Sequence, residues 1–370
     1  MLPLVFLGFV NLFNNRLGAS SRILVVLIIG ILLLQFIPIG DHKGFPQYTG
    51  QISQWKLWSI SPSRSLEANL YALSVLGVSL FICRMNTLQH KRLIRFIFLG
   101  FSINLLVGII QLSYGSKIKI TGVLPFDISS GVFANENHFS SLVYMIIPLV
   151  AWRVLVESWR PLVYFLIVVL IVLFQFSIGS RAGMAMALSL ALFSYLWIFL
   201  NRIPNKAKVA ALVGSIFIAG VGILMFDTSS ILEGDYRQII FATTWLAIQQ
   251  HLITGTGLGS FVLVYPMYEA TKDVQRFYAN QAHNDYLQLL LELGLMFIPL
   301  FLFFLIQMFR NMFRSGFTQY ISISLFAVLL HSIIDYPLRT MAIAIVFGTL
   351  LAILFSERDE LKVSEKNELR

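Results

Sequence analysis

The stretch Asn280-Gln-Ala-His-Asn-Asp-Tyr-Leu-Gln-Leu-Leu-Leu-Glu-Leu-Gly294 places a polar segment with a histidine directly before a long apolar run. The apolar run extends to Phe309 and is long enough to cross a bilayer as a helix. The polar segment that ends at this histidine starts at Asp227 and is the longest in the chain. We therefore expect His283 at a membrane boundary, where an aqueous loop becomes a span.

The composition is that of an integral membrane protein. Of the 370 residues, 57% are hydrophobic and only 12% are charged, and the mean hydropathy is +0.79. A soluble domain has about a quarter of its residues charged. Many apolar runs are about 20 residues long, which favours helices over the shorter, alternating strands of a barrel. We expect an all-α, polytopic membrane bundle of about ten, and up to twelve, transmembrane helices with one large structured periplasmic loop.

The basic residues indicate the orientation of the chain. The apolar runs cover residues 23–39, 67–83, 93–113, 139–156, 161–178, 182–200, 207–226, 285–309, 318–334 and 341–356. Alternate loops between them are short and rich in Lys and Arg, which is typical of cytoplasmic loops. The net charge of +9 therefore reflects orientation in a membrane and does not indicate nucleic acid. The expected organisation is amino-terminal helices at 1–226, a periplasmic loop at 227–284, carboxy-terminal helices at 285–356 and a cytoplasmic tail at 357–370. The run 1–13 is expected to form an interfacial or partial helix.

The periplasmic loop contains a predicted helix that Asp235 can cap. Its apolar positions recur at helical spacing, which predicts an amphipathic helix on the membrane or over a cavity mouth. These positions are Ile239, Ile240, Trp245, Leu246 and Ile248. The next segment, Gly255-Thr-Gly-Leu-Gly259, has the glycine content of a phosphate loop, but no strand precedes it, which favours a flexible turn.

Two arginines on the periplasmic side are candidates for binding an anion. Arg181 begins a span directly after Ser180, which can cap that helix, so the guanidinium lies beside a positive helix end. An interfacial arginine that reaches lipid headgroups fits the same position. Arg237 lies in the first turn of the periplasmic helix, against the dipole preference, which indicates either another partner or simple exposure.

His283 is the candidate base, because a neutral imidazole accepts a proton near neutral pH. A surface or capping histidine is the alternative. The neighbouring Glu292 is a carboxylate inside a span and needs a partner. His331, Asp335 and Arg339 are expected to form a hydrogen-bonded cluster or to orient a substrate.

The polar segment before the fourth expected span is the last candidate. It consists of Asn135-Glu-Asn-His138, and either helix capping or contact with a sugar or water fits its residues. Asn284, beside His283, is a further candidate for substrate contact.

Several motifs are absent from the sequence. We find no Walker sequence, and no clustered Cys, His or acidic residues that would hold a metal, so neither a metal nor a cofactor is expected. Cys83 is the single cysteine and lies in an apolar run. Arginines and a histidine without a metal suit the displacement of an activated anionic leaving group, such as a lipid pyrophosphate.

The sequence resembles the superfamily of O-antigen ligases and O-antigen polymerases. The resemblance rests on Gly-Ser-Arg-Ala-Gly around Arg181, on Asp-Tyr-Arg at Arg237 and the helix that follows, and on Gly255–Gly259. It also rests on His283-Asn284 followed by nine residues and Gly294, which is similar to the ligase pattern. Phe297 stands where that pattern has Gly, Thr or Tyr, so ligase and polymerase both stay open.

The resemblance implies a metal-independent, inverting glycosyltransferase of the bacterial inner membrane with its active site facing the periplasm. The donor would be an undecaprenyl-pyrophosphate-linked glycan held by Arg181 and Arg237, and His283 would activate the acceptor hydroxyl. The acceptor would be another glycan, lipid A core or a protein hydroxyl. Asn284, Asn135, Asn137, His138, Arg339 and Asp335 are the expected substrate contacts, and membrane lipid is the other partner. A secondary transporter of a small anion or polar solute is the alternative. The spans lack paired charges at mid-depth and any evident inverted repeat with broken helices, which argues against transport.

Overall fold

The computed structural model describes residues 2–13, 18–38, 57–114, 130–178, 180–199, 236–275 and 278–356. Every element within these ranges is helical, which confirms the all-α class. Four helices are long and apolar enough to cross a membrane, and shorter apolar helices accompany them. The four are Pro62–Ile82, Thr87–Ser113, Glu136–Val156 and Asp285–Met312. The span expected at 207–226 and the cap expected at Asp235 lie outside the described residues.

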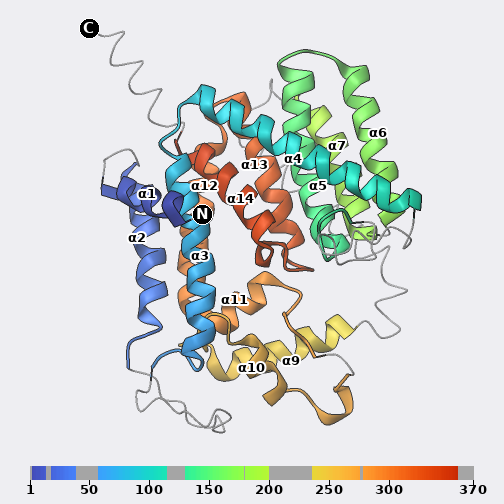
Figure 1. The fold of residues 1–370 in the computed structure, drawn as a ribbon. Helices are drawn as coiled ribbons and strands as arrows, with labels where there is room; N and C mark the ends of the chain where they lie inside the picture. The colour runs from blue at the N-terminus through green and yellow to red at the C-terminus, as the bar shows by residue number, and fades with distance from the viewer. Residues whose placement is uncertain are drawn as a thin grey trace.

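The amino-terminal helices form one side of the molecule (Figure 1). These are α1 (Leu2–Phe13), α2 (Ala19–Leu34) and α3 (Pro62–Ile82). The run expected as an interfacial or partial helix is α1, and it crosses α3 where Gly8 meets the backbone of Gly77. Helices α2 and α3 lie side by side, because the Asn69 side-chain amide donates to the carbonyl of Leu32 at 2.8 Å.

The centre of the bundle is α5, which packs against α7 and α13. Its bounds are Glu136–Ala151, and a π-helical turn, Trp152–Val156, continues it. Residues 139–149 of α5 are all buried, because small and apolar side chains cover the whole helix circumference. Around it lie α6 (Pro161–Ile178), α7 (Arg181–Trp197), α13 (Gly316–His331) and α14 (Met341–Ser356). The peripheral helix α4 (Thr87–Tyr114) runs obliquely across the others in Figure 1.

The expected single span at 285–309 is broken. Helix α11 (Asp285–Leu293) ends at Gly294, a 3-10 turn covers Gly294–Met296, and α12 (Phe297–Met312) follows. Gly294 has φ 61° and ψ −149°, a conformation essentially restricted to glycine. The free end of α11 is bonded to a neighbouring loop, since Thr256 and Gly257 donate backbone N–H groups to the carbonyls of Leu291 and Glu292. The single span expected here therefore consists of two helices joined by a short turn.

Helices α9 (Tyr236–His251) and α10 (Phe261–Val264) lie with α11 at one end of the molecule (Figure 1). The buried face of α9 consists of Ile240, Thr243, Thr244, Ala247 and Ile248. Trp245 and Leu246 lie on another side of the helix and are 47% and 52% exposed.

The glycine-rich segment before α10 is a turn, as expected, but it is anchored and buried rather than flexible. Gly255, Gly257 and Gly259 all have positive φ, and a Cβ on Gly255 or Gly257 would meet the chain around Gly294 or Ser59. The turn therefore closes the end of α11 with backbone groups, which only glycine permits at this approach.

Candidate functional site

His283 lies directly before the N-cap of α11 in a strained backbone conformation. Its φ is 50°, in the left-handed region that costs a non-glycine residue about 1–3 kcal/mol. The next residue, Asn284, is the N-cap, and its Oδ1 accepts from the backbone N–H groups of Tyr286 and Leu287 at 2.9 and 3.0 Å. Strain of this kind persists where surrounding contacts hold it, and it gathers at functional sites.

The imidazole of His283 pairs with a buried carboxylate. Its Nδ1 lies 3.6 Å from Oδ1 of Asp335, just beyond hydrogen-bond distance, and the contact becomes an ion pair when the imidazole is protonated. The His283 side chain is 24% exposed and that of Asp335 is 2% exposed. A solute can therefore reach the imidazole, whereas the Asp335 carboxylate is buried and contacts the histidine from inside the protein.

Burial raises the pKa of Asp335, but other groups outweigh burial. Contact with His283 and the charges of His331 and Arg237 hold this pKa below its ordinary value of 3.8. The Oδ1 atom also accepts from the backbone N–H of Tyr336 at 2.9 Å. Asp335 is therefore a stable carboxylate at neutral pH.

Tyr336 packs between two histidines. Its ring meets His283 edge-on at 4.9 Å between centroids and His138 at 5.0 Å. The Nδ1 atom of His138 is hydrogen-bonded to the Thr340 hydroxyl at 2.7 Å, and the Asn135 side chain hydrogen-bonds Tyr336. The structure thus brings the first turn of α5 to the same site as His283.

Arg237 also reaches this site from the first turn of α9. Its charge lowers the pKa of both Asp335 and Tyr336. The negative charge of Asp335 is thus a nearby counter-charge for a cation that opposes its own helix dipole.

Arg181 is the first residue of α7, but its side chain lies outside the described residues. Ser180 caps α7, as predicted, by accepting from the Gly183 N–H at 3.2 Å, and its hydroxyl donates to Asn137 Oδ1 at 2.9 Å. Asn137 in turn donates its N–H to Asn135 Oδ1 at 2.8 Å. The helix start that carries Arg181 is thus tied to the start of α5.

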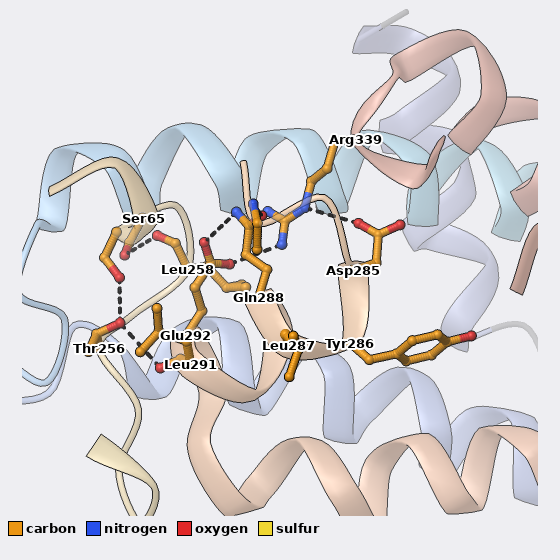
Figure 2. A network of polar contacts seen from close by, with 12 residues as sticks. Ser65, Thr256, Leu258, Asp285, Tyr286, Leu287, Gln288, Leu291, Glu292 and Arg339 are labelled. Atoms are coloured by element: carbon orange, nitrogen blue, oxygen red, sulfur yellow. Dashed lines mark hydrogen bonds and ion pairs between the residues drawn. The ribbon is translucent and has the colours of Figure 1, made fainter. Parts of the chain in front are cut away.

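The expected cluster of His331, Asp335 and Arg339 is divided among three different contacts. Asp335 faces His283, whereas His331 Nδ1 lies 2.7 Å from the Tyr144 hydroxyl and joins α13 to α5. Arg339 pairs with two buried carboxylates of α11, with Nε 3.5 Å from Asp285 Oδ1 and Nη2 3.2 Å from Glu292 Oε2 (Figure 2). Glu292 therefore has the partner that a buried carboxylate needs.

Tyr336 and Gln288 are two residues of the site region that the sequence patterns did not predict. Tyr336 follows Asp335 directly, which is a weak signal, because a tyrosine near a membrane boundary is commonplace. Gln288 lies on the same face of α11 as Asp285 and Glu292, and this spacing of three and four residues could have revealed a polar stripe inside an apolar helix.

The fold and the site define an integral membrane protein of the all-helical class, with a histidine, a carboxylate and an arginine gathered at one end of the bundle. Residues 166–304 match the family model described as O-antigen ligase, which supports membership of the chain in the O-antigen ligase superfamily. Such membership points to glycosyl transfer of the ligase or polymerase type, from a lipid-linked glycan to a glycan acceptor. The match includes Arg237 and His283, whereas Asp335 and Tyr336 lie beyond it. No curated protein matches the chain.

Proposed function

We propose that this protein transfers a glycan from undecaprenyl pyrophosphate to an acceptor hydroxyl at the periplasmic face of the bacterial inner membrane. The observation that carries the proposal is the His283–Asp335 pair, with its reachable imidazole and buried carboxylate, inside the charge field of Arg237. The inner membrane, the periplasmic orientation and a bundle of about ten spans belong to the same proposal.

In this mechanism His283 is the general base. Its imidazole takes the proton of the acceptor hydroxyl, and the acceptor oxygen attacks the anomeric carbon of the donor sugar. The bond between that carbon and the pyrophosphate oxygen breaks, which inverts the anomeric configuration and releases undecaprenyl pyrophosphate. Asp335 orients the ring and stabilises the imidazolium that forms.

The leaving group carries negative charge, and the site offers several positive elements to hold it. The amino-terminal ends of α5 and α7 are joined through Asn137 and Ser180, and α11 begins beside His283. Free backbone N–H groups and helix dipoles make such ends favourable for phosphate groups. We assign Arg237 and Arg181 to the pyrophosphate, and His138, Asn135, Asn137 and Asn284 to the edges of the substrate site.

A direct assay uses the purified full-length protein in lipid nanodiscs with an undecaprenyl-pyrophosphate-linked glycan and a chelator. We expect transfer without added divalent metal, and no turnover for His283→Ala with donor binding largely retained. Arg181→Ala should weaken donor binding and turnover together. Full dependence on added metal, or unchanged turnover in His283→Ala, would contradict the mechanism.

The acceptor can be identified from the glycan phenotype of a deletion strain. Lipopolysaccharide without repeat units, together with accumulated long lipid-linked chains, indicates a ligase for lipid A core. Loss of long chains with single units still attached indicates a polymerase. Unchanged lipopolysaccharide with loss of glycan from a protein indicates transfer to a protein hydroxyl.

A secondary transporter is the second candidate, because the structure shows features that transport sites favour. These are the break between α11 and α12 and the paired charges of Glu292 and Arg339 beside it. Uptake of a radiolabelled anion into vesicles that survives His283→Ala would support transport and would rule out the enzyme.

A further inference from the structure

A stripe of polar side chains follows one face of α11 immediately after His283. Asp285, Gln288 and Glu292 are all buried, and Gln288 Nε2 donates to Glu292 Oε1 at 3.1 Å. Arg339 completes the group through its contacts with Asp285 and Glu292 (Figure 2). Buried polar groups are costly unless they are paired, so this set is expected to hold one fixed arrangement.

Gln288 connects the stripe to the backbone that carries His283. Its Oε1 accepts from the backbone N–H of Ala282 at 3.0 Å, one residue before the strained position. On the other side of the histidine, Asn284 is fixed by its own capping bonds to α11. The residues on both sides of His283, Ala282 and Asn284, are therefore both anchored to this helix, which helps to hold a φ of 50°.

The same stripe also holds the segment that carries Asp335. Ser332 accepts the backbone N–H of Asp285 at 2.9 Å, and its hydroxyl donates to Asp285 Oδ2 at 3.0 Å. Arg339 joins the same segment to α11, and the Tyr71 hydroxyl of α3 donates to the Leu338 carbonyl at 2.8 Å. The histidine and its carboxylate thus belong to two segments that the stripe fastens together.

The charges of this group argue against a direct role of Arg339 in binding the donor. One guanidinium faces two carboxylates, so the cluster as a whole does not attract a pyrophosphate. The guanidinium of Arg339 already contacts carboxylate oxygens, and a phosphate would have to displace these oxygens to bind there.

We propose that Gln288, Glu292, Asp285 and Arg339 form a positioning device that holds His283 in register with Asp335. None of the four touches the substrate. They act through the backbone on either side of the histidine and through the segment that contains its carboxylate. This inference rests on the proposed role of His283 as the base, but the placement of the histidine can be measured without any reaction.

The first test is hydrogen exchange of the full-length protein in nanodiscs. Gln288→Met keeps the length of the side chain and removes both of its hydrogen bonds, so the amides at 282–284 should exchange faster. Gln307→Met is the matched control, because Gln307 is a buried glutamine of α12 whose side-chain nitrogen has no hydrogen-bond partner among the described residues. Unchanged exchange at 282–284 in Gln288→Met would overturn the proposal.

The second test separates positioning from donor binding by steady-state kinetics. Gln288→Met and Glu292→Gln should each lower kcat about 10- to 100-fold, the effect of a small misplacement of a catalytic group, while the donor KM changes by less than about twofold. Together they should cost about as much as the stronger single change, since both break one device. Additive losses would overturn the linkage, as would a raised donor KM with unchanged kcat in Arg339→Lys.

The two tests keep the two proposals apart. If the wild-type protein transfers no glycan, the proposed function fails, and hydrogen exchange still decides whether the device holds His283. If glycan is transferred but the exchange at 282–284 does not respond to Gln288→Met, the function stands and the positioning device is refuted.

Discussion

Nδ1 of His283 lies 3.6 Å from Oδ1 of Asp335, and the two residues come from different segments at the same end of the bundle. The imidazole is accessible to solvent and the carboxylate is buried. A substrate can therefore approach the imidazole, while Asp335 provides the counter-charge on its buried side. Catalytic contacts of this kind are often long without substrate and shorten in the reacting complex.

Removing the charge of Asp335 should slow catalysis with little effect on donor binding. For Asp335→Asn we expect kcat to fall about 100-fold, within the range of general acid–base contributions, with the donor KM nearly unchanged. Steady-state transfer assays measure both constants. Asp273→Asn is the control, since Asp273 lies in the 3-10 turn Thr271–Asp273, which has no buried residue. A change confined to KM would assign Asp335 to the donor instead.

The same carboxylate should make the folded state sensitive to acid. Its folded pKa lies below the ordinary value of 3.8, so its stabilisation is complete above that value and is lost as the pH falls through the folded pKa. At neutral pH the Asp335→Asn protein should be less stable than wild type by about 1–3 kcal/mol. Thermal unfolding in detergent should show this difference narrowing below about pH 4. A constant difference down to about pH 3 would contradict the assignment.

Arg237 should contribute to donor affinity more than Lys272, which is an exposed cation of the same region. We expect Arg237→Gln to raise the donor KM about tenfold, because it removes charge-assisted hydrogen bonds to the pyrophosphate, and Arg237→Lys to restore part of the loss. Lys272→Gln should leave the donor KM unchanged. Equal effects of the two substitutions would indicate general attraction of the lipid rather than a defined contact.

Gly294 should tolerate no side chain. A Cβ there would lie 2.6 Å from the backbone nitrogen of Gly255, and the backbone conformation itself excludes other residues. We expect Gly294→Ala to destabilise the protein by about 2–4 kcal/mol through strain and overpacking, measured by thermal unfolding in detergent. Gly100→Ala is the control, because Gly100 lies in α4 with open space around it and should be neutral or slightly stabilising.

The membrane helices and their caps followed from local information. The apolar runs predict the positions of α5, α6 and α14 closely. In lipid an unpaired peptide group is costly, so an apolar run long enough to span the membrane forms a helix whatever its neighbours are. Ser180 was likewise predicted as a cap, because a cap bonds to backbone groups of its own first turn.

The faces and breaks of helices were harder to predict. The apolar positions of α9 do not all share one environment, since Ile240 and Ile248 are buried in the protein whereas Trp245 and Leu246 are exposed, and hydropathy alone does not say which side of a helix has a neighbour. The apolar pattern did not predict the break at Gly294, because the break depends on a loop distant in the sequence that is hydrogen-bonded to the end of α11.

The sequence by itself determined that the chain is a helical membrane protein, and it singled out His283, Arg181 and Arg237 through local chemistry and the order of the loops. Tertiary structure alone decided the pairing. Asp335 pairs with His283, whereas Arg339 pairs with Asp285 and Glu292, although Asp335 and Arg339 are only four residues apart in the sequence. Ion pairs in a low-dielectric interior depend on a few ångströms of separation, and those separations are set by how α11 packs against the segment after α13.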